Sequence, residues 1–304
     1  METSPWVPAG EPPATAWVRL AGTPSGPRIF RKQVAATAPG LRPGQRVAGL
    51  DKRGSLVGWG LFHPRSEIRV RLLRRGPDPA DDAWLRERAA AAALRRLEDP
   101  LVAGSGDAWR VLHAEGDDFP GLTVDRLGEV LSAEAYTLGA VSLFETVLPV
   151  LHERLGTAHH RISFAAARAR AEGERAFERR SQGCPRRVKI QEHGVRFEVD
   201  LEEGHKTGFF CDQRENRRRL AALARGRTVL DVCCYSGGFA IAAAIAGARS
   251  VLGIDLDESV LPQARRNANL NQERVAFVHA DAFSYLRTLW RNGRRFDVIV
   301  LDPP

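Results

Sequence analysis

The chain has few cysteines and no long apolar segment. Only four of its 304 residues are cysteine, and their spacing fits neither a zinc site nor a disulfide framework. No apolar run approaches the roughly 20 residues that span a bilayer. Residues 1–13 have neither the basic start nor the apolar core of a signal peptide. We therefore expect a cytoplasmic protein with no metal ion and no membrane contact.

Lysine is also scarce, although the chain is basic. It contains 45 Lys and Arg against 37 Asp and Glu, a formal net charge of +8. The lysines are Lys32, Lys52, Lys189 and Lys206. A basic surface favours polyanions such as RNA, whereas an arginine bias also follows from the base composition of a genome. The charge therefore supports an RNA partner without establishing one.

The most informative segment is LDVCCYSGGF at residues 230–239. Thr228–Val232 is a short apolar run typical of a strand, and residues 239–248 form an alanine-rich helix candidate. Between them, Gly237 and Gly238 let the backbone turn sharply and let a ligand lie against it. This strand, glycine turn and helix predict the start of a nucleotide-binding βαβ unit.

Three further apolar runs follow, and an acid stands at the end of each. The runs begin near residues 250, 275 and 296 and lead to Asp255, Asp281 and Asp302. Asp255 can accept both hydroxyl protons of a ribose, Asp281 is placed for an adenine amino group, and Asp302 for the reacting methyl. One such acid alone is often a helix cap or a turn residue. The ordered series instead predicts a site for S-adenosylmethionine (SAM).

A dinucleotide is the competing ligand. Its site requires a Gly-x-Gly-x-x-Gly turn that holds a phosphate at a helix amino terminus. The turn Tyr235-Ser236-Gly237-Gly238 lacks the third glycine. A nicotinamide-dependent dehydrogenase is therefore the weaker interpretation.

Short β-like runs separated by Gly and Pro dominate the first part of the chain and predict a small barrel. They are Trp17–Leu20, Arg46–Leu50, Leu56–Phe62 and residues 68–73. A helix is expected over residues 82–97. The next region is expected to contain strands at residues 109–114 and 130–136 and a helix at 141–155.

The charged segment 168–187 is expected to be a linker. After it, runs at residues 188–191 and 195–199 flank His193-Gly194 and predict a hairpin. We therefore divide the chain into a disordered tail (1–16), a barrel domain (17–78), an α+β linking domain (79–180) and an α/β domain (181–304).

From residue 17 onward, the sequence resembles the large-subunit (23S) ribosomal RNA methyltransferase I family. The most specific motifs are GHKTGFFCDQR at residues 204–214 and the segment 231–239, and the segments 60–71 and 115–125 support them. The resemblance implies a PUA domain that binds RNA, a linking domain, and a Rossmann-like class I SAM methyltransferase domain. It also implies methylation of C5 of a cytosine in 23S rRNA.

Together with the strand-end argument, the resemblance predicts the cofactor-binding residues Phe210, Asp212, Gln213, Asp231, Tyr235, Ser236, Gly237, Gly238, Phe239, Asp255, Asp281 and Asp302. Lys206 and Arg214 are expected to contact the substrate, and Asp302 is the candidate catalytic residue. Arg217, Arg218 and Arg219 are expected to form a solvated helix face.

The chain departs from the family pattern in several places. His205 stands where glutamine is usual, Cys211 where leucine is common, and residues 26–37 lack the usual aromatic signature. A domain of this class has about three further strands after the fourth. We therefore expect that the methyltransferase domain is truncated at Pro304.

This ending affects the expected chemistry. C5 of cytosine is a poor nucleophile, so such enzymes add a cysteine thiolate to C6. None of Cys184, Cys211, Cys233 and Cys234 is a convincing candidate, and we expect the nucleophile beyond Pro304. Two alternatives stay open: a methyltransferase acting on an amino nitrogen, because Asp-Pro-Pro also occurs there, and an inactive fragment that binds RNA or SAM. A homodimer is a further open alternative.

Overall fold

The computed structural model describes residues 16–202, 204 and 207–303. The chain forms two compact units, residues 1–98 with 110–184 and residues 99–109 with 185–304. The predicted tail therefore lies, except for Ala16, outside the described residues. The boundaries predicted for the three domains stay a prediction.

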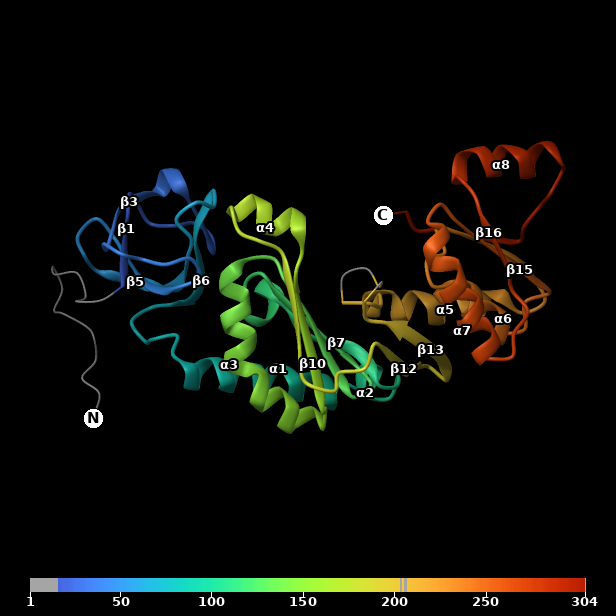
Figure 1. Cartoon of the computed structure of the whole chain (residues 1–304), viewed down its shortest axis with the longest axis horizontal. Helices are drawn as coiled ribbons and strands as arrows, with labels where there is room; N and C mark the ends of the chain where they lie inside the picture. Colours follow the sequence, from blue (N-terminus) through green and yellow to red (C-terminus); the bar gives the residue numbers. More distant parts are fainter. Residues whose placement is uncertain (1–15, 203, 205–206, 304) are drawn as a thin grey trace. The chain divides into compact units, whose positions relative to one another are not determined.

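Unit 1 begins with a six-stranded sheet in the order β2-β6-β5-β4-β1-β3, which curls on itself (Figure 1). The strands are β1 (Trp17–Leu20), β2 (Arg28–Phe30), β3 (Val34–Thr37), β4 (Arg46–Leu50), β5 (Leu56–Phe62) and β6 (Ile68–Arg75). Apolar side chains from five of these strands fill the core: Val18, Leu20, Ile29, Val47, Phe62, Val70 and Leu72. The curled sheet confirms the predicted small β domain and four of its strands, whereas β2 and β3 were not predicted.

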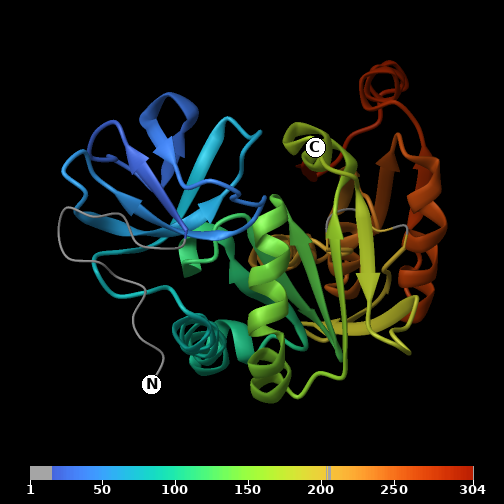
Figure 2. The ribbon, with the colours of Figure 1, turned by 60° about the vertical axis from the view of Figure 1, so that its left-hand side comes forward.

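A five-stranded sheet in the order β11-β10-β9-β8-β7 follows. Its strands are β7 (Ala108–His113), β8 (Leu122–Leu127), β9 (Val130–Ala135), β10 (His159–Phe164) and β11 (Phe177–Arg180). Helix α3 (Leu138–Leu155) packs on β8, β9 and β10, and α1 (Asp82–Glu98) packs beside α3 (Figure 2). Four shorter helices occur in the described residues up to 172: η1 (Arg31–Gln33) between β2 and β3, α2 (Pro100–Ala103) in unit 2, and η2 (Ala114–Asp117) and α4 (Ala166–Glu172) in unit 1.

The linker predicted over residues 168–187 is wrong at residues 168–172, which belong to a helix, and at residues 177–180, which form a strand. Helix α4 begins before it, and β11 pairs with β10 in antiparallel register from Phe164↔Phe177 to Arg161↔Arg180. The charge that suggested a linker instead belongs to an edge strand, because Glu178 pairs with both Arg161 and Arg180. Edge strands commonly carry charges on their open side.

Unit 2 contains the predicted hairpin and a parallel sheet. The hairpin, β12 (Arg187–Glu192) and β13 (Val195–Asp200), is in register from Arg187↔Asp200 to Glu192↔Val195. The four parallel strands have the order β16-β15-β14-β17. They are β14 (Thr228–Val232), β15 (Ser250–Asp255), β16 (Ala276–His279) and β17 (Val298–Leu301).

Helices cover both faces of the parallel sheet. Successive side chains of β14 point to opposite faces. Leu230 and Val232 pack with Leu289 of α8 (Ala282–Arg291), whereas Asp231 accepts a hydrogen bond from Ala240 of α6 (Gly238–Ile245). The remaining elements of unit 2 are η3 (Cys211–Gln213), α5 (Arg214–Ala224), η4 (Glu258–Val260) and α7 (Leu261–Leu270). The sheet is therefore doubly wound, as predicted for the α/β fold class.

Candidate active site

The order of the parallel strands creates a crevice at one edge of the sheet. From β14 the chain proceeds outward through β15 to β16, and then returns to pair β17 with the other side of β14. In doubly wound sheets, ligands bind at the carboxyl ends of the strands where the order reverses. Asp255 ends β15 and Asp302 follows β17, so these two predicted residues flank the end of β14.

The turn after β14 is held in a strained conformation. Cys233 has φ 64°, Tyr235 has φ 47° and Gly237 has φ 83°, and only glycine adopts this left-handed region without cost. Backbone hydrogen bonds fix the turn, from Cys234 N to Ile254 O (3.0 Å) and from Gly237 N to Cys234 O (2.8 Å). Strain of this kind persists where the surrounding structure over-determines it, which is common at functional sites.

Both glycines of the turn are closely packed against neighbouring side chains. A Cβ on Gly237 would lie 2.9 Å from Cζ of Phe277, and a Cβ on Gly238 would lie 3.0 Å from Cδ of Arg217. The positive φ of Gly237 confirms the predicted sharp turn at that residue. Their close neighbours in the structure are the side chains of β16 and α5, which adds a packing role to the predicted approach of a ligand.

Asp255 connects the turn to the neighbouring strand. Its Oδ2 accepts a hydrogen bond from the amide of Tyr235 (2.8 Å), and its Oδ1 accepts one from the amide of Asp257 (2.9 Å). A carboxylate oxygen has two lone pairs, so each oxygen keeps one acceptor position. The side chain is thereby fixed in orientation, and its geometry is compatible with two ribose hydroxyls.

Asp231 occupies a different environment from the other acids. It is completely buried, its Oδ2 accepts a hydrogen bond from the amide of Ala240 (3.0 Å), and its Oδ1 has no hydrogen-bond partner among the described residues. Burial, reinforced by the charges of Asp302 and Asp255, raises the pKa of Asp231 to about 7. The structure therefore places Asp231 beneath the crevice as a cap of α6, and its direct contact with a cofactor stays a prediction.

The raised pKa gives a testable pH dependence. Native Asp231 holds its proton more tightly than the unfolded chain, so the free energy of unfolding falls as the pH rises from about 4 to about 7 and is then level. Three pKa units correspond to roughly 4 kcal/mol. We expect Asp231→Asn to remove this slope, so that the variant gains stability relative to the wild type at pH 8 compared with pH 5, as measured by urea unfolding. Parallel pH profiles of the two proteins would contradict this.

Asp297 provides a control carboxylate. It directly precedes β17 and lies beside Thr228, the first residue of β14, at the end of the sheet away from the crevice. Hydrogen bonds from Thr228 lower the pKa of the exposed Asp297. This group stabilises the folded chain above its unfolded pKa, and the contribution is lost as the pH falls. Asp297→Asn is therefore expected to change the pH profile in the opposite direction to Asp231→Asn.

The other predicted residues are only partly gathered at the crevice. The ring of Phe210 packs edge-on against Tyr235, with 5.2 Å between centroids, and the Tyr235 hydroxyl donates to Gly208 O at 3.5 Å. Asp281 is exposed and caps α8 by accepting from the amide of Ser284. Asp212 is exposed, and Gln213 accepts from Asn216.

Of the two predicted substrate-binding residues, the structure describes only Arg214. The side chain of Arg214 is only 11% exposed and lies 3.7 Å from Glu215. Lys206 lies outside the described residues.

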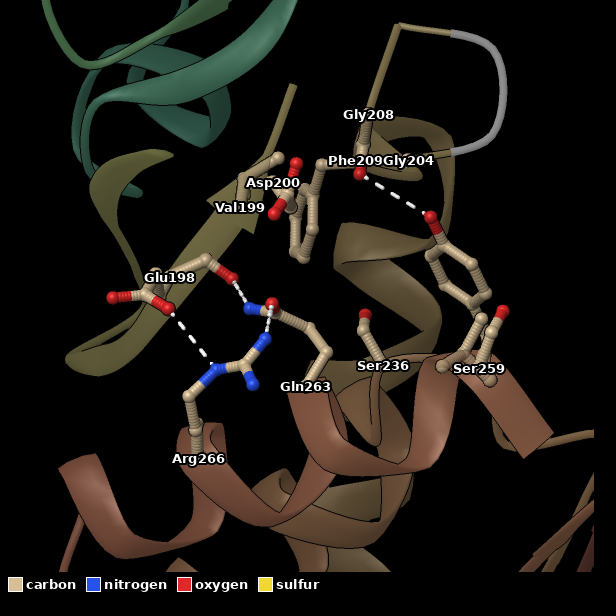
Figure 3. A pocket seen from close by; sticks show the side chains of 12 residues that line it. Glu198, Val199, Asp200, Gly204, Gly208, Phe209, Ser236, Ser259, Gln263 and Arg266 are labelled. Carbon is tan, nitrogen blue, oxygen red and sulfur yellow. Dashed lines mark hydrogen bonds and ion pairs between the residues drawn. The ribbon is translucent and has the colours of Figure 1, made fainter. Parts of the chain in front are cut away.

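A pocket adjoins the turn on the side of β13 and α7 (Figure 3). It shares Tyr235 and Ser236 with the predicted site, but the three strand-end acids, Asp255, Asp281 and Asp302, do not line it. Its other polar lining residues include Glu198, Gln263 and Arg266. The guanidinium of Arg266 forms an ion pair with Glu198 at 3.2 Å and donates a hydrogen bond to Gln263 at 2.6 Å. Sequence reasoning missed these three residues because they belong to no motif and meet only through packing of the hairpin on α7.

The predicted solvated face of α5 is wrong at Arg217. This side chain is buried, and its guanidinium donates to both oxygens of Glu192 at 2.6 Å and to the carbonyl of Phe210 at 2.9 Å. Arg218 and Arg219 are exposed as predicted. The sequence contained a signal for this burial. Arg217 lies three and seven residues before the buried Leu220 and Ala224, and this spacing places all three side chains on one face of the helix.

Among the described residues, no group of three or more His, Cys, Asp or Glu side chains could hold a metal ion. None of the helices in the same part of the chain combines the length and apolar character needed to cross a membrane.

Comparisons with known proteins agree with this architecture. Residues 147–304 match the family described as S-adenosylmethionine-dependent methyltransferase, and residues 26–75 match the PUA-like domain. Two solved structures share the fold at 22% identity. One, a crystal structure with SAH bound, has a TM-score of 0.74 over 92% of this chain and 72% of that one. The other, a protein from Streptococcus mutans, has a TM-score of 0.71 over 88% and 70%.

Curated relatives match nearly the whole chain. A ribosomal RNA large subunit methyltransferase of Deinococcus radiodurans is 37% identical over 292 residues, which is 91% of this chain and 71% of the relative. Ribosomal RNA large subunit methyltransferase I of Salmonella arizonae is 31% identical over 91% of this chain and 70% of the relative. The chain therefore belongs to the SAM-dependent ribosomal RNA large subunit methyltransferase family.

Proposed function

We propose that the chain binds SAM in the crevice at the carboxyl ends of β14, β15 and β17 and methylates C5 of a cytosine in 23S rRNA. The observation that carries the proposal is the strained turn at Cys233–Tyr235, which Asp255 fixes at the point where the strand order reverses. The chemistry of the donor set fits the cofactor. The charges of Asp302 and Asp255 help to raise the pKa of the buried Asp231, so negative charge gathers at this edge of the sheet, and a positively charged sulfonium group would be favoured beside it.

Roles for the other residues follow from their places around the crevice. Asp255 would accept the ribose hydroxyls, Asp281 would meet the adenine amino group, and Asp302 would lie beside the transferred methyl. Phe210 and the turn residues would enclose the remainder of the cofactor, with Asp212 and Gln213 at the entrance. SAM supplies an electrophilic methyl group, and these side chains orient it and the target base.

The thiol chemistry supports a nucleophile outside the four cysteines of the chain. Methylation at C5 requires a thiolate that adds to C6 and is expelled when the C5 proton leaves. Burial and the charges of Asp255, Asp231 and Asp302 raise the pKa of Cys233, which disfavours its thiolate. Cys211 and Cys234 are buried, and burial raises the pKa of Cys184.

An RNA substrate is supported by the basic composition, the PUA-like match and the names of the relatives. The test is incubation of the purified chain with 23S rRNA and methyl-labelled SAM, followed by mass spectrometry of the nucleosides. Because none of the four cysteines is supported as the nucleophile, the experiment is decided by the position of any methyl group that is transferred, and we expect that position to be C5 of cytidine. A methyl group on an exocyclic amine would contradict carbon methylation, and SAM binding without transfer would favour the inactive alternative.

A further inference from the structure

Arg217 joins four segments of unit 2 through one buried side chain. Its guanidinium forms a bidentate pair with Glu192, the last residue of β12, with both N–O distances 2.6 Å. It also donates to the carbonyl of Phe210 at 2.9 Å and lies 4.7 Å above the ring of Phe209. The Arg217 side chain also packs closely on Gly238, because a Cβ added to Gly238 would lie only 3.0 Å from Cδ of Arg217. The hairpin, the segment before η3, α5 and the start of α6 therefore meet at this residue.

Stability alone is a poor explanation for this pair. Glu192 and Arg217 are 2% and 4% exposed, and desolvation of two buried charges usually offsets most of their attraction. An apolar pair of similar volume would often be as stable. An apolar pair, however, has no hydrogen-bond donors. The planar guanidinium has several in a fixed arrangement, so it can bind a carboxylate and a backbone carbonyl at the same time.

The carbonyl that Arg217 holds belongs to a residue of the proposed cofactor site. Phe210 packs edge-on against Tyr235 of the strained turn, and η3, which contains Asp212 and Gln213, begins at the residue after Phe210. On the other side, Arg217 lies against Gly238, which begins α6 after that turn. The guanidinium thus contacts the backbone of one wall of the proposed site and packs on the other wall.

We infer that Arg217, oriented by Glu192, is a positioning residue for the cofactor: it holds residues 208–213 against the turn at Tyr235 without touching the cofactor itself. This inference rests on the proposed function, because it assigns Arg217 to the same SAM site. Arg217 sets the affinity for the cofactor by keeping that wall preorganised, since a wall that must be ordered upon binding lowers the affinity.

The test uses Arg217→Lys in the full chain, with Arg218→Lys as the matched control. Lysine keeps the positive charge beside Glu192 but cannot hold the carboxylate in bidentate fashion and reach Phe210 O together. Arg218 lies on the same helix and pairs with Glu215 at the exposed surface. Two quantities are measured: hydrogen exchange of residues 207–213 without ligand, and the dissociation constant for SAH by calorimetry.

For Arg217→Lys we expect exchange of residues 207–213 to rise about fivefold while the hairpin stays protected, and SAH to bind about tenfold more weakly. Arg218→Lys should match the wild type in both. If Arg217→Lys does not fold, Glu192→Gln, which keeps one acceptor oxygen, is measured in the same way. Unchanged exchange and unchanged affinity would overturn the inference, whereas a wild-type chain that binds no SAH would instead refute the proposed function.

Discussion

Replacing Asp255 by alanine is expected to weaken SAM binding by a hundredfold or more, the largest effect of any single substitution at the proposed site. Asp255 is proposed to accept two ribose hydroxyls, and hydrogen bonds to a charged group are worth about 1.5–3 kcal/mol each. The same carboxylate holds the amide of Tyr235, whose left-handed conformation it fixes. Removing it therefore loses two ligand contacts and the preorganisation of the turn.

The measurement is calorimetric titration of SAH into the wild type and Asp255→Ala, with Asp257→Asn as the control. Asp257 is two residues away and accepts from the amide of Ser259 at the start of η4. We expect the control to bind SAH within about threefold of the wild type. If Asp255→Ala bound SAH as tightly as the control, the ribose assignment would be wrong.

Substituting Glu192 by alanine is expected to cause the largest loss of stability. It leaves Arg217 buried without its carboxylate, and removing one partner of a buried ion pair costs about 3–5 kcal/mol. Urea unfolding measures the change. Glu215→Ala is the comparison, because Glu215 pairs with the exposed Arg218 and surface pairs contribute about 0–1 kcal/mol. The double variant Glu192→Met with Arg217→Met should recover most of the lost stability, and equal effects of the two glutamate substitutions would contradict the burial argument.

Elements with clear alternation or apolar runs could be predicted from the sequence, and weakly patterned ones could not. β1, β4, β5 and β14 have the predicted bounds because each is short, apolar and ended by turn residues. Strand β2 was missed because it is three residues long with one buried side chain, and β11 because FERR resembles a linker. Pairing with a neighbouring strand determines these elements, and single-strand patterns do not contain that information.

In the candidate site, too, some residue positions could be predicted from the sequence and some contacts could not. The positions of Asp255 and Asp302 follow from the rule that parallel strands present their carboxyl ends at one edge, and the structure has them there. The burial of Asp231 follows from alternation along β14 only once the position of α6 is known. The pairing of Arg217 with Glu192 depends on how the hairpin packs on α5, 25 residues away in sequence, and no local pattern indicates it.

The central claim is that the crevice at the end of β14 binds SAM, and hydrogen exchange with and without SAH tests it most directly. We expect SAH to protect the amides of residues 208–213, of the turn at 233–238 and of 255–257. The six-stranded sheet of unit 1 should exchange at the same rate in both samples. Protection confined to other parts of the chain, or no protection at saturating SAH, would contradict the account.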